Sequence, residues 1–223
     1  MITVHHLQHS RSHRIIWLLE ELELPYQIKA YQREARFLAP DALKKIHPLG
    51  KSPVITDENR VIAESGAILE YLERQYDTDY RLSLTHPDEQ IQSRYWLHYA
   101  EGSLMPLLVM KLIFNQFNKP PVPWLLRPIG GLFAQGFNKA YLLKQLATHQ
   151  AFIEAHLAEH AWFAGRTFSI ADVQMSYPVL ALQTRGDAGD FPATQAWLEK
   201  ICQRSAWIRA QEKGGAPLAG TLE

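Results

Sequence analysis

The stretch of sequence that decides the fold is residues 47–55, which read His-Pro-Leu-Gly-Lys-Ser-Pro-Val-Ile. It ends in a short β-branched run. A polar turn follows, and then a second β-branched run at Val61–Ala63, so this pattern predicts a hairpin. After the hairpin the apolar residues take up helical spacing, and we expect Ser65 to cap the helix that follows. A loop that ends in Ser52-Pro53 therefore leads into a hairpin, and the hairpin leads into the N-terminus of a helix.

This loop has the features of a site for a small peptide with charged ends. A Ser-Pro bond prefers the trans form by only about 0.5–1 kcal/mol, so a cis Pro53 is accessible. It would turn the backbone N–H and C=O of Ser52 outward as a strand edge that can pair with an extended ligand backbone. Lys51 offers a charge for a carboxylate, the helix N-terminus at Ser65 favours an anion, and Glu64 suits an ammonium group.

Each of these residues also has a purely structural interpretation. Lys51 alone could be a solvated loop lysine, and Glu64 and Ser65 could be residues that cap the first turn of a helix. The segment Gly50–Ser52 could belong to a phosphate-binding loop, but that motif needs a glycine where Lys45 stands and a helix where Pro53 forbids one. The pairing of the two motifs at this spacing favours the binding interpretation.

Together, the motifs at residues 47–53 and 64–68 resemble the glutathione-binding core of the cytosolic glutathione transferases. The resemblance extends along essentially the whole chain. It implies a fold of the class α/β plus all-α, with a thioredoxin-like N-terminal domain followed by an all-helical C-terminal domain. Within this scheme we expect a thioredoxin-like domain over residues 1–77, a linker over 78–87 and a helical domain over 88–223.

The resemblance also implies which residues bind glutathione, the co-substrate of that family. Ser52, with Pro53 behind it, would pair with the cysteinyl backbone of glutathione. Lys51 would approach the glycyl carboxylate, and Glu64 and Ser65 would hold the γ-glutamyl end.

In that family a hydroxyl group at the end of the first strand addresses the glutathione sulfur. Here the first strand is expected at Ile2–Leu7, and counting back four residues from Arg14, as the serine-using classes do, gives Ser10. Ser12 is the alternative, and either serine could instead cap the first helix, which we expect at Ile15–Leu22.

The energy required makes such a hydroxyl group necessary. Lowering a thiol pKa from about 8.5 by about two units requires about 2.7 kcal/mol. A helix dipole supplies about 0.3–1 kcal/mol and at best ~2, whereas a hydrogen bond to the charged sulfur adds about 1.5–3 kcal/mol. The dipole and a serine together therefore suffice.

The order of elements in the first domain follows from short patterns. After the first strand and helix we expect a second strand at Tyr26–Tyr31, a weaker helix at Pro40–Ile46, the hairpin and a helix that ends at Tyr76. This order predicts a mixed sheet with helices on both faces.

Composition excludes several kinds of partner and site. The chain has 223 residues, and its 23 basic and 23 acidic residues balance, so no overall charge points to nucleic acid or to a membrane. The N-terminus has no signal-peptide pattern, and we expect a cytoplasmic protein. The single cysteine, Cys202, is expected to pack in the core.

We expect no metal site, because the N-terminal histidines lack ligands to complete a set. We interpret them as surface or strand-end residues. They are His5, His6, His9 and His13.

The second domain is expected to carry the pocket for the other substrate, a small apolar electrophile or a peroxide. Its candidate residues are Tyr99, Met105 and Phe114, although an apolar helix here could equally be core. Residues 119–136 are rich in proline and glycine and are unusually apolar for a loop. We interpret them as a non-helical insertion that covers the pocket or packs at a subunit contact.

Two features are expected near the C-terminus. Ser169 and Asp172 stand in capping-box spacing, which gives Asp172 a structural role at a helix start. Two short helices around Trp197 and Trp207 should close the domain, and a mobile tail should begin at Gly214.

The function that the resemblance implies is glutathione transfer. The thiolate of glutathione would attack an electrophilic carbon or the oxygen of a peroxide, in a homodimer formed through the third and fourth helices. The alternative is a protein that keeps the fold and serves as a non-catalytic binding or assembly module.

Overall fold

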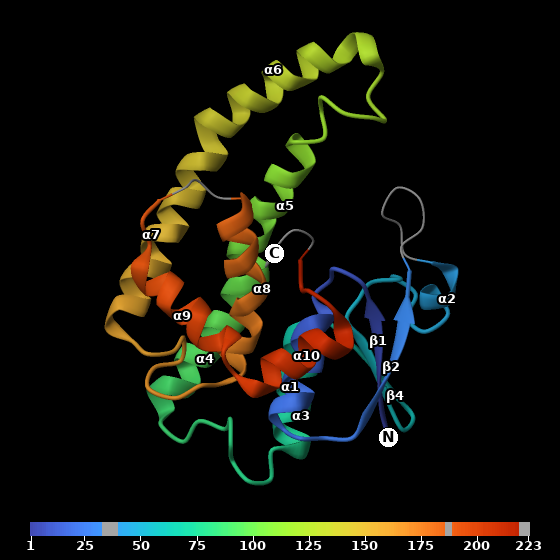
Figure 1. Cartoon of the computed structure of the whole chain (residues 1–223), viewed down its shortest axis with the longest axis vertical. Coiled ribbons are helices and arrows are strands. Elements are labelled where there is room, and N and C mark those ends of the chain that lie inside the picture. The colour runs from blue at the N-terminus through green and yellow to red at the C-terminus, as the bar shows by residue number, and fades with distance from the viewer. Residues whose placement is uncertain (33–39, 186–188, 219–223) are drawn as a thin grey trace.

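The computed structural model describes residues 1–32, 40–185 and 189–218 of the chain. Its first part is a four-stranded mixed sheet with the strand order β2-β1-β3-β4 (Figure 1). Val4 of β1 lies opposite Ile28 on the parallel side and opposite Ile55 on the antiparallel side. The strands are β1 (Ile2–Leu7), β2 (Tyr26–Tyr31), β3 (Val54–Asp57) and β4 (Arg60–Ala63).

The helices of this part connect the strands as expected. They are α1 (Ser12–Glu21), α2 (Asp41–Lys44) and α3 (Ser65–Tyr76). The expectation that Ser65 caps α3 is wrong, because Ser65 is already the first helical residue. The N-cap is Glu64, whose φ of 69° places it in the left-handed region, and no side chain caps this helix.

The rest of the described chain is helical. Its α-helices are α4 (Pro87–Tyr99), α5 (Met105–Phe114), α6 (Arg127–Phe137), α7 (Leu143–Glu159), α8 (Ile170–Arg185), α9 (Pro192–Cys202) and α10 (Ser205–Gly214). The π-helical segments Ala100–Leu104 and Asn138–Leu142 join α4 to α5 and α6 to α7. The two long helices that result form a hairpin that projects beyond the body of the molecule (Figure 1).

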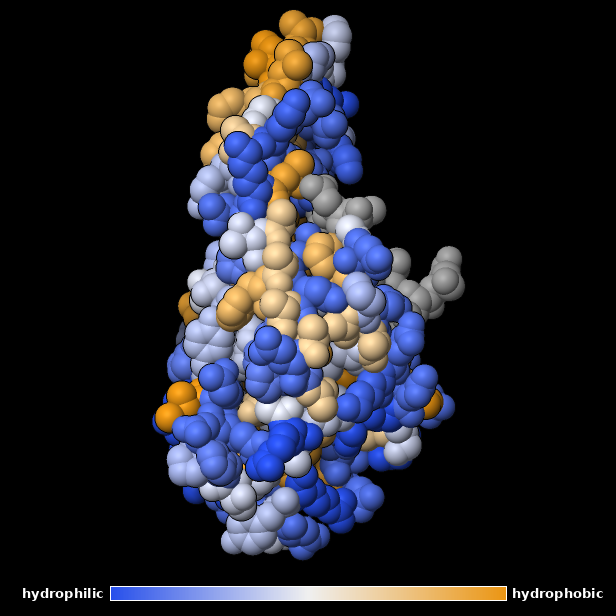
Figure 2. Space-filling view, turned by 90° about the vertical axis from the view of Figure 1, so that its left-hand side faces the viewer, coloured by the Kyte–Doolittle hydropathy of each residue, from blue (hydrophilic) through white to orange (hydrophobic). Residues whose placement is uncertain are grey.

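The interpretation of residues 119–136 as non-helical is wrong for the part that forms α6. Packing decides this: a Cβ atom on Gly130 would lie 2.4 Å from the backbone oxygen of Phe117, so glycine lets α6 approach the end of α5. The close approach outweighs a helix propensity cost of about 1 kcal/mol for glycine. Apolar side chains remain exposed at this tip, where Figure 2 shows them in orange.

The expectation of a mobile tail is also wrong for the residues that the structure describes. After α10 the chain continues to residue 218, and the side chains of Pro217 and Leu218 are buried. The remaining residues, 219–223, lie outside the described part.

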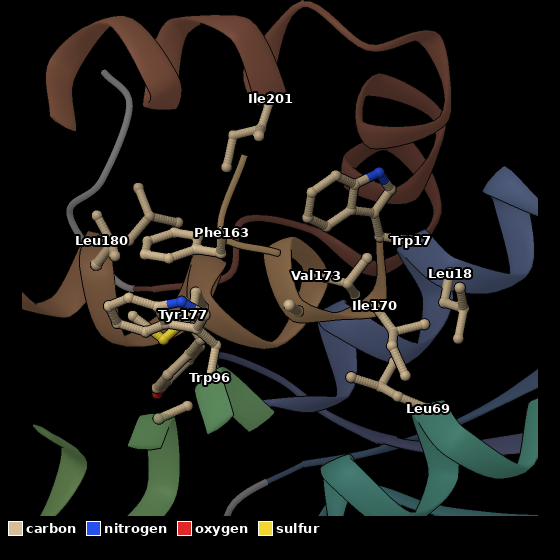
Figure 3. Packing of buried hydrophobic residues seen from close by; sticks show 14 of the residues in the cluster. Trp17, Leu18, Leu69, Trp96, Phe163, Ile170, Val173, Tyr177, Leu180 and Ile201 are labelled. Atoms are coloured by element: carbon tan, nitrogen blue, oxygen red, sulfur yellow. The ribbon is translucent and has the colours of Figure 1, made fainter. Parts of the chain in front are cut away.

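Helix α8 holds the two parts together. It packs against α1 and α3 on one side and against α4 and α5 on the other. Figure 3 shows Ile170 of α8 between Leu18 of α1 and Leu69 of α3, with Val173 of α8 nearby. All four side chains are almost completely buried, so one continuous core fixes the helical part against the sheet.

His5 and His6 lie near the end of β1, as the strand-end interpretation predicts, but the surface interpretation is wrong for them and for His13, because all three are buried. His13 packs edge-on against Trp207, and neither of its ring nitrogens has a hydrogen-bond partner among the described residues. Burial, with a smaller contribution from His6, lowers the pKa of His13 to about 3. His13 is therefore neutral in the folded protein at neutral pH.

This buried histidine predicts acid sensitivity. Between pH 6.5 and about pH 3 the unfolded chain binds a proton at His13 and the folded chain does not, so stability falls as the pH is lowered through this window. At pH ~4 the loss amounts to about 3 kcal/mol. The measurement is the free energy of unfolding in urea across this range. In His13→Phe the acid-dependent loss should shrink by this amount, whereas the exposed control His98→Phe should keep it; an unchanged slope in His13→Phe would contradict the prediction.

Candidate active site

Two serine hydroxyl groups meet where β1 runs into α1. The Oγ atoms of Ser10 and Ser12 lie 2.7 Å apart, and both side chains are buried. The backbone N–H of Ser12 donates to Ser10 Oγ at 3.2 Å. Ser12 is the first residue of α1 and Arg11 is its N-cap, so neither serine is the N-cap residue.

This pair belongs to a longer chain of hydrogen bonds. On one side, Nδ1 of His6 lies 2.8 Å from Ser12 Oγ. On the other side, the Ser10 hydroxyl donates to Ser52 Oγ at 3.4 Å, and the Ser52 hydroxyl donates to the backbone oxygen of His5 at 3.1 Å. The structure thus brings Ser10 together with Ser52, from the loop before β3.

The loop residues predicted to bind glutathione lie around this point. The Ser52-Pro53 bond takes the cis form that the sequence makes accessible, and Pro53 is buried. Lys51 is exposed beside it. Glu64 is exposed and Ser65 is buried at the N-terminus of α3, directly after β4, which pairs with β3.

An ion-pair network that the sequence analysis missed ties this region to the helical part. The guanidinium groups of Arg11 and Arg14 both donate to Glu101 Oε1, at 2.9 and 2.6 Å. Arg14 is fully buried and also donates to the backbone oxygen of Gln174 at 2.6 Å. Burial acts to raise the pKa of Glu101, but the two guanidinium groups hold it below its usual value. The carboxylate is therefore charged; Arg14 fixes α1 to Glu101 and to α8, and Arg11 fixes the turn before α1 to Glu101.

Gln174 was also missed, and it presents unused hydrogen-bonding capacity. Its side chain is fully buried in α8, yet neither its amide nitrogen nor its amide oxygen has a partner among the described residues. The nitrogen lies 3.7 Å from where a Cβ atom on Gly66 would stand, so the amide group is next to the N-terminus of α3. One feature of the sequence could have indicated this residue: a glutamine stands inside an apolar helix, two residues after Asp172.

The three residues proposed to line the second-substrate pocket lie in three different environments. The hydroxyl group of Tyr99 lies 2.5 Å from Nδ1 of His149, which points Tyr99 toward α7. Met105 belongs to the buried core. Phe114 stacks on Phe137 of α6, near the base of the projecting hairpin.

Cys202 packs partly buried against the core, and burial raises the pKa of its thiol. Within the described ranges, no cluster of three or more histidine, cysteine, aspartate or glutamate side chains could hold a metal ion. Nor does any helix in the described part have the length and apolar character needed to cross a membrane.

Comparison with known proteins agrees with this geometry. Residues 1–74 match the family model "Glutathione S-transferase, N-terminal domain", and residues 122–205 match "Glutathione S-transferase, C-terminal domain". The chain is 38% identical to glutathione S-transferase 3 of Schizosaccharomyces pombe over 96% of its own length and 88% of the relative. It is 33% identical to glutathione S-transferase 1 of Saccharomyces cerevisiae, with 97% and 96% covered.

A solved structure gives the same result for the fold. The crystal structure of a glutathione S-transferase from Actinobacillus pleuropneumoniae superposes with a TM-score of 0.82 at 33% identity, covering 98% of this chain and 95% of that one. The relatives and the family models thus cover both the sheet and the helical part. The chain belongs to the glutathione S-transferase family.

Proposed function

We propose that this protein is a glutathione transferase that activates the glutathione thiol with Ser10. The observation that carries the proposal is the meeting of the Ser10 and Ser52 hydroxyl groups at 3.4 Å. It places a hydroxyl donor beside the residue proposed to pair with the cysteinyl backbone of glutathione. The sulfur of a cysteine bound there would lie within reach of Ser10.

The other proposed contacts hold the two ends of the tripeptide. Lys51 would bind the glycyl carboxylate, and Glu64 and the N-terminus of α3 at Ser65 would bind the γ-glutamyl ammonium and carboxylate. Gln174 is a further candidate, because its unpartnered amide group lies next to that helix end. A bound glutamyl group is a polar partner of the kind that this buried amide lacks.

The hydrogen bonds of Ser10 and Ser52 indicate the direction in which Ser10 donates. The Ser52 hydroxyl donates to the His5 carbonyl, so Ser52 Oγ accepts from Ser10. The Ser12 hydroxyl lies 2.7 Å from Ser10 Oγ and 2.8 Å from Nδ1 of His6, and it donates to the backbone oxygen of Leu7 at 3.4 Å. Burial lowers the pKa of His6, which keeps the ring neutral. In this arrangement the Ser10 proton points toward Ser52, where the thiolate would replace Ser52 as its acceptor.

The reaction that follows is nucleophilic attack by the thiolate. With an electrophilic carbon, a C–S bond forms and the leaving group departs with its electron pair. With a peroxide, the O–O bond breaks, an alcohol leaves, and the sulfenic form of glutathione reacts with a second glutathione to give the disulfide and water. The second substrate would be a small apolar molecule in either case.

Assembly as a homodimer through α3 and α4 is part of the proposal. The exposed apolar side chains Ile91 and Tyr95 on α4 support it, because they line a shallow hollow with Tyr99. A cytoplasmic location is proposed as well, and the single unpaired cysteine supports it.

A titration of the thiol tests the proposed function. Thiolate absorbance in the ultraviolet is followed with pH for the protein–glutathione complex, and S-methylglutathione, which has no thiol, gives the baseline. We expect a bound thiol pKa well below the ordinary value of about 8.5. Binding of glutathione with an unshifted pKa would overturn the proposal and favour the non-catalytic module.

A further inference from the structure

The projecting hairpin ends in an exposed apolar surface, which we call the apolar tip. Each of its large apolar side chains is at least 52% exposed, and Figure 2 shows orange residues gathered there at the top of the molecule. The side chains that form the apolar tip are Trp124, Leu125, Leu126, Ile129, Leu132 and Phe133.

Helix α6 carries the second half of this surface on the side opposite its small residues. The small residues Gly130 and Ala134 lie toward the protein, since a Cβ atom on Gly130 would meet Phe117 and Ala134 is buried. Ile129 and Leu132 lie on the exposed side, and Phe133, although 61% exposed, lies parallel to the ring of Phe117. A helix of a soluble protein normally buries its large apolar side chains, so this face is built to contact something else.

The charge of the hairpin differs from that of the whole chain. Between Glu101 and Glu154 the sequence contains no aspartate and no glutamate. The basic residues of this segment are Lys111, Lys119, Arg127, Lys139 and Lys144. The balanced total of 23 basic and 23 acidic residues conceals this local excess of positive charge.

A hollow beside the apolar tip combines the two properties. It lies between the end of α5 and α6, and Lys119, Lys139 and Leu132 share its lining with Asn115 and Asn118. Ammonium and amide groups are donors for the oxygens of a phosphate group. The hollow thus places phosphate-binding groups next to side chains that favour an apolar phase.

We propose that the apolar tip docks on the surface of an anionic phospholipid bilayer. The large apolar side chains would enter the boundary between headgroups and acyl chains, and Lys119 and Lys139 would contact lipid phosphates. Such docking needs no membrane-spanning helix. Charge complementarity favours a lipid surface over a second copy of the chain, because two tips brought together would oppose positive charges.

Trp124 provides a reporter for the test, because every other tryptophan of the chain is buried. The intact protein is mixed with vesicles of phosphatidylcholine alone, or of phosphatidylcholine with phosphatidylglycerol. We expect the anionic vesicles to shift the tryptophan emission to shorter wavelength, to protect it from acrylamide and to carry the protein upward in a flotation gradient. Added salt should weaken this binding. The variant Trp124→Phe should lose the spectral shift and still float with the vesicles.

Paired variants separate the two contributions. Ile129→Ser with Leu132→Ser should abolish flotation, whereas Ile208→Ser, an exposed isoleucine of α10, should leave it unchanged. Lys119→Gln with Lys139→Gln should remove the preference for anionic vesicles. Conjugation by these variants in the absence of lipid should match the native protein, which separates this proposal from that of the glutathione site.

Two results would overturn the proposal. One is the absence of flotation with anionic vesicles. The other is a shift of Trp124 emission that depends on protein concentration without lipid, with Ile129→Ser and Leu132→Ser reducing the oligomeric state in size-exclusion chromatography. That second result would assign the apolar tip to a contact with a second copy.

Discussion

Replacing Ser10 with alanine is expected to lower kcat/KM for glutathione conjugation by about ten- to a hundredfold, because a hydrogen bond to a charged acceptor contributes about 1.5–3 kcal/mol. The binding constant for glutathione should change little, since the proposed contacts of Lys51, Glu64 and Ser65 hold the two ends of the tripeptide. The measurements are steady-state kinetics with an aromatic electrophile and calorimetric titration with glutathione. The bound thiol pKa should rise toward its ordinary value of about 8.5 in the variant.

The matched control is Ser12→Ala, because the two hydroxyl groups lie 2.7 Å apart. Ser12 is proposed to orient Ser10 rather than to contact sulfur, so its removal should have a smaller effect on kcat/KM and on the thiol pKa. An inactive Ser12→Ala beside a fully active Ser10→Ala would reverse the assignment. Equal, complete loss in both would show that the pair acts as one unit.

Local sequence patterns predicted the sheet well. The runs at Ile2–Leu7 and Tyr26–Tyr31 form strands over the predicted ranges, and the Ser52-Pro53 bond is cis. In each case the decisive interactions lie within a few residues of the chain. The helix α6 could not be predicted in this way, because Gly130 lets it approach the backbone of Phe117, and local sequence patterns do not show that approach.

Some parts of the candidate site could likewise be predicted from local sequence, and others could not. The motif around Ser52 and the serines before α1 are visible in the sequence, although only the structure shows that Ser10 and Ser52 meet. Gln174 and Glu101 come from the helical part, and their proximity to the site depends on how α8 and the end of α4 pack against α1. Helical spacing alone did not reveal that Tyr99 points to α7, because spacing places a residue on a face of its own helix and does not say which helix packs there.

The buried side chain of Asp172 holds together three segments of the helical part. Its Oδ1 atom accepts from the backbone N–H of Phe163 and from the indole N–H of Trp197, both at 3.0 Å. Its Oδ2 atom accepts from the backbone N–H of Ser169 at 3.0 Å, which confirms the predicted capping box. The carboxylate thus joins the start of α8 to α9 and to the loop before α8.

Asp172→Ala is therefore expected to destabilise the protein by about 3–5 kcal/mol, because each buried donor left without a partner costs about 1–3 kcal/mol. That is a large part of a typical unfolding free energy of about 5–15 kcal/mol, so urea denaturation should show a much earlier midpoint. Ser169→Ala is the matched control: it removes one hydroxyl group that donates to Asp172 and accepts from Ala171, and should cost only about 0.5–2 kcal/mol. Turnover per folded molecule should stay intact in both variants, because Asp172 contacts structural groups alone in the described network. A fully stable Asp172→Ala protein with lost turnover would instead place this carboxylate in the chemistry.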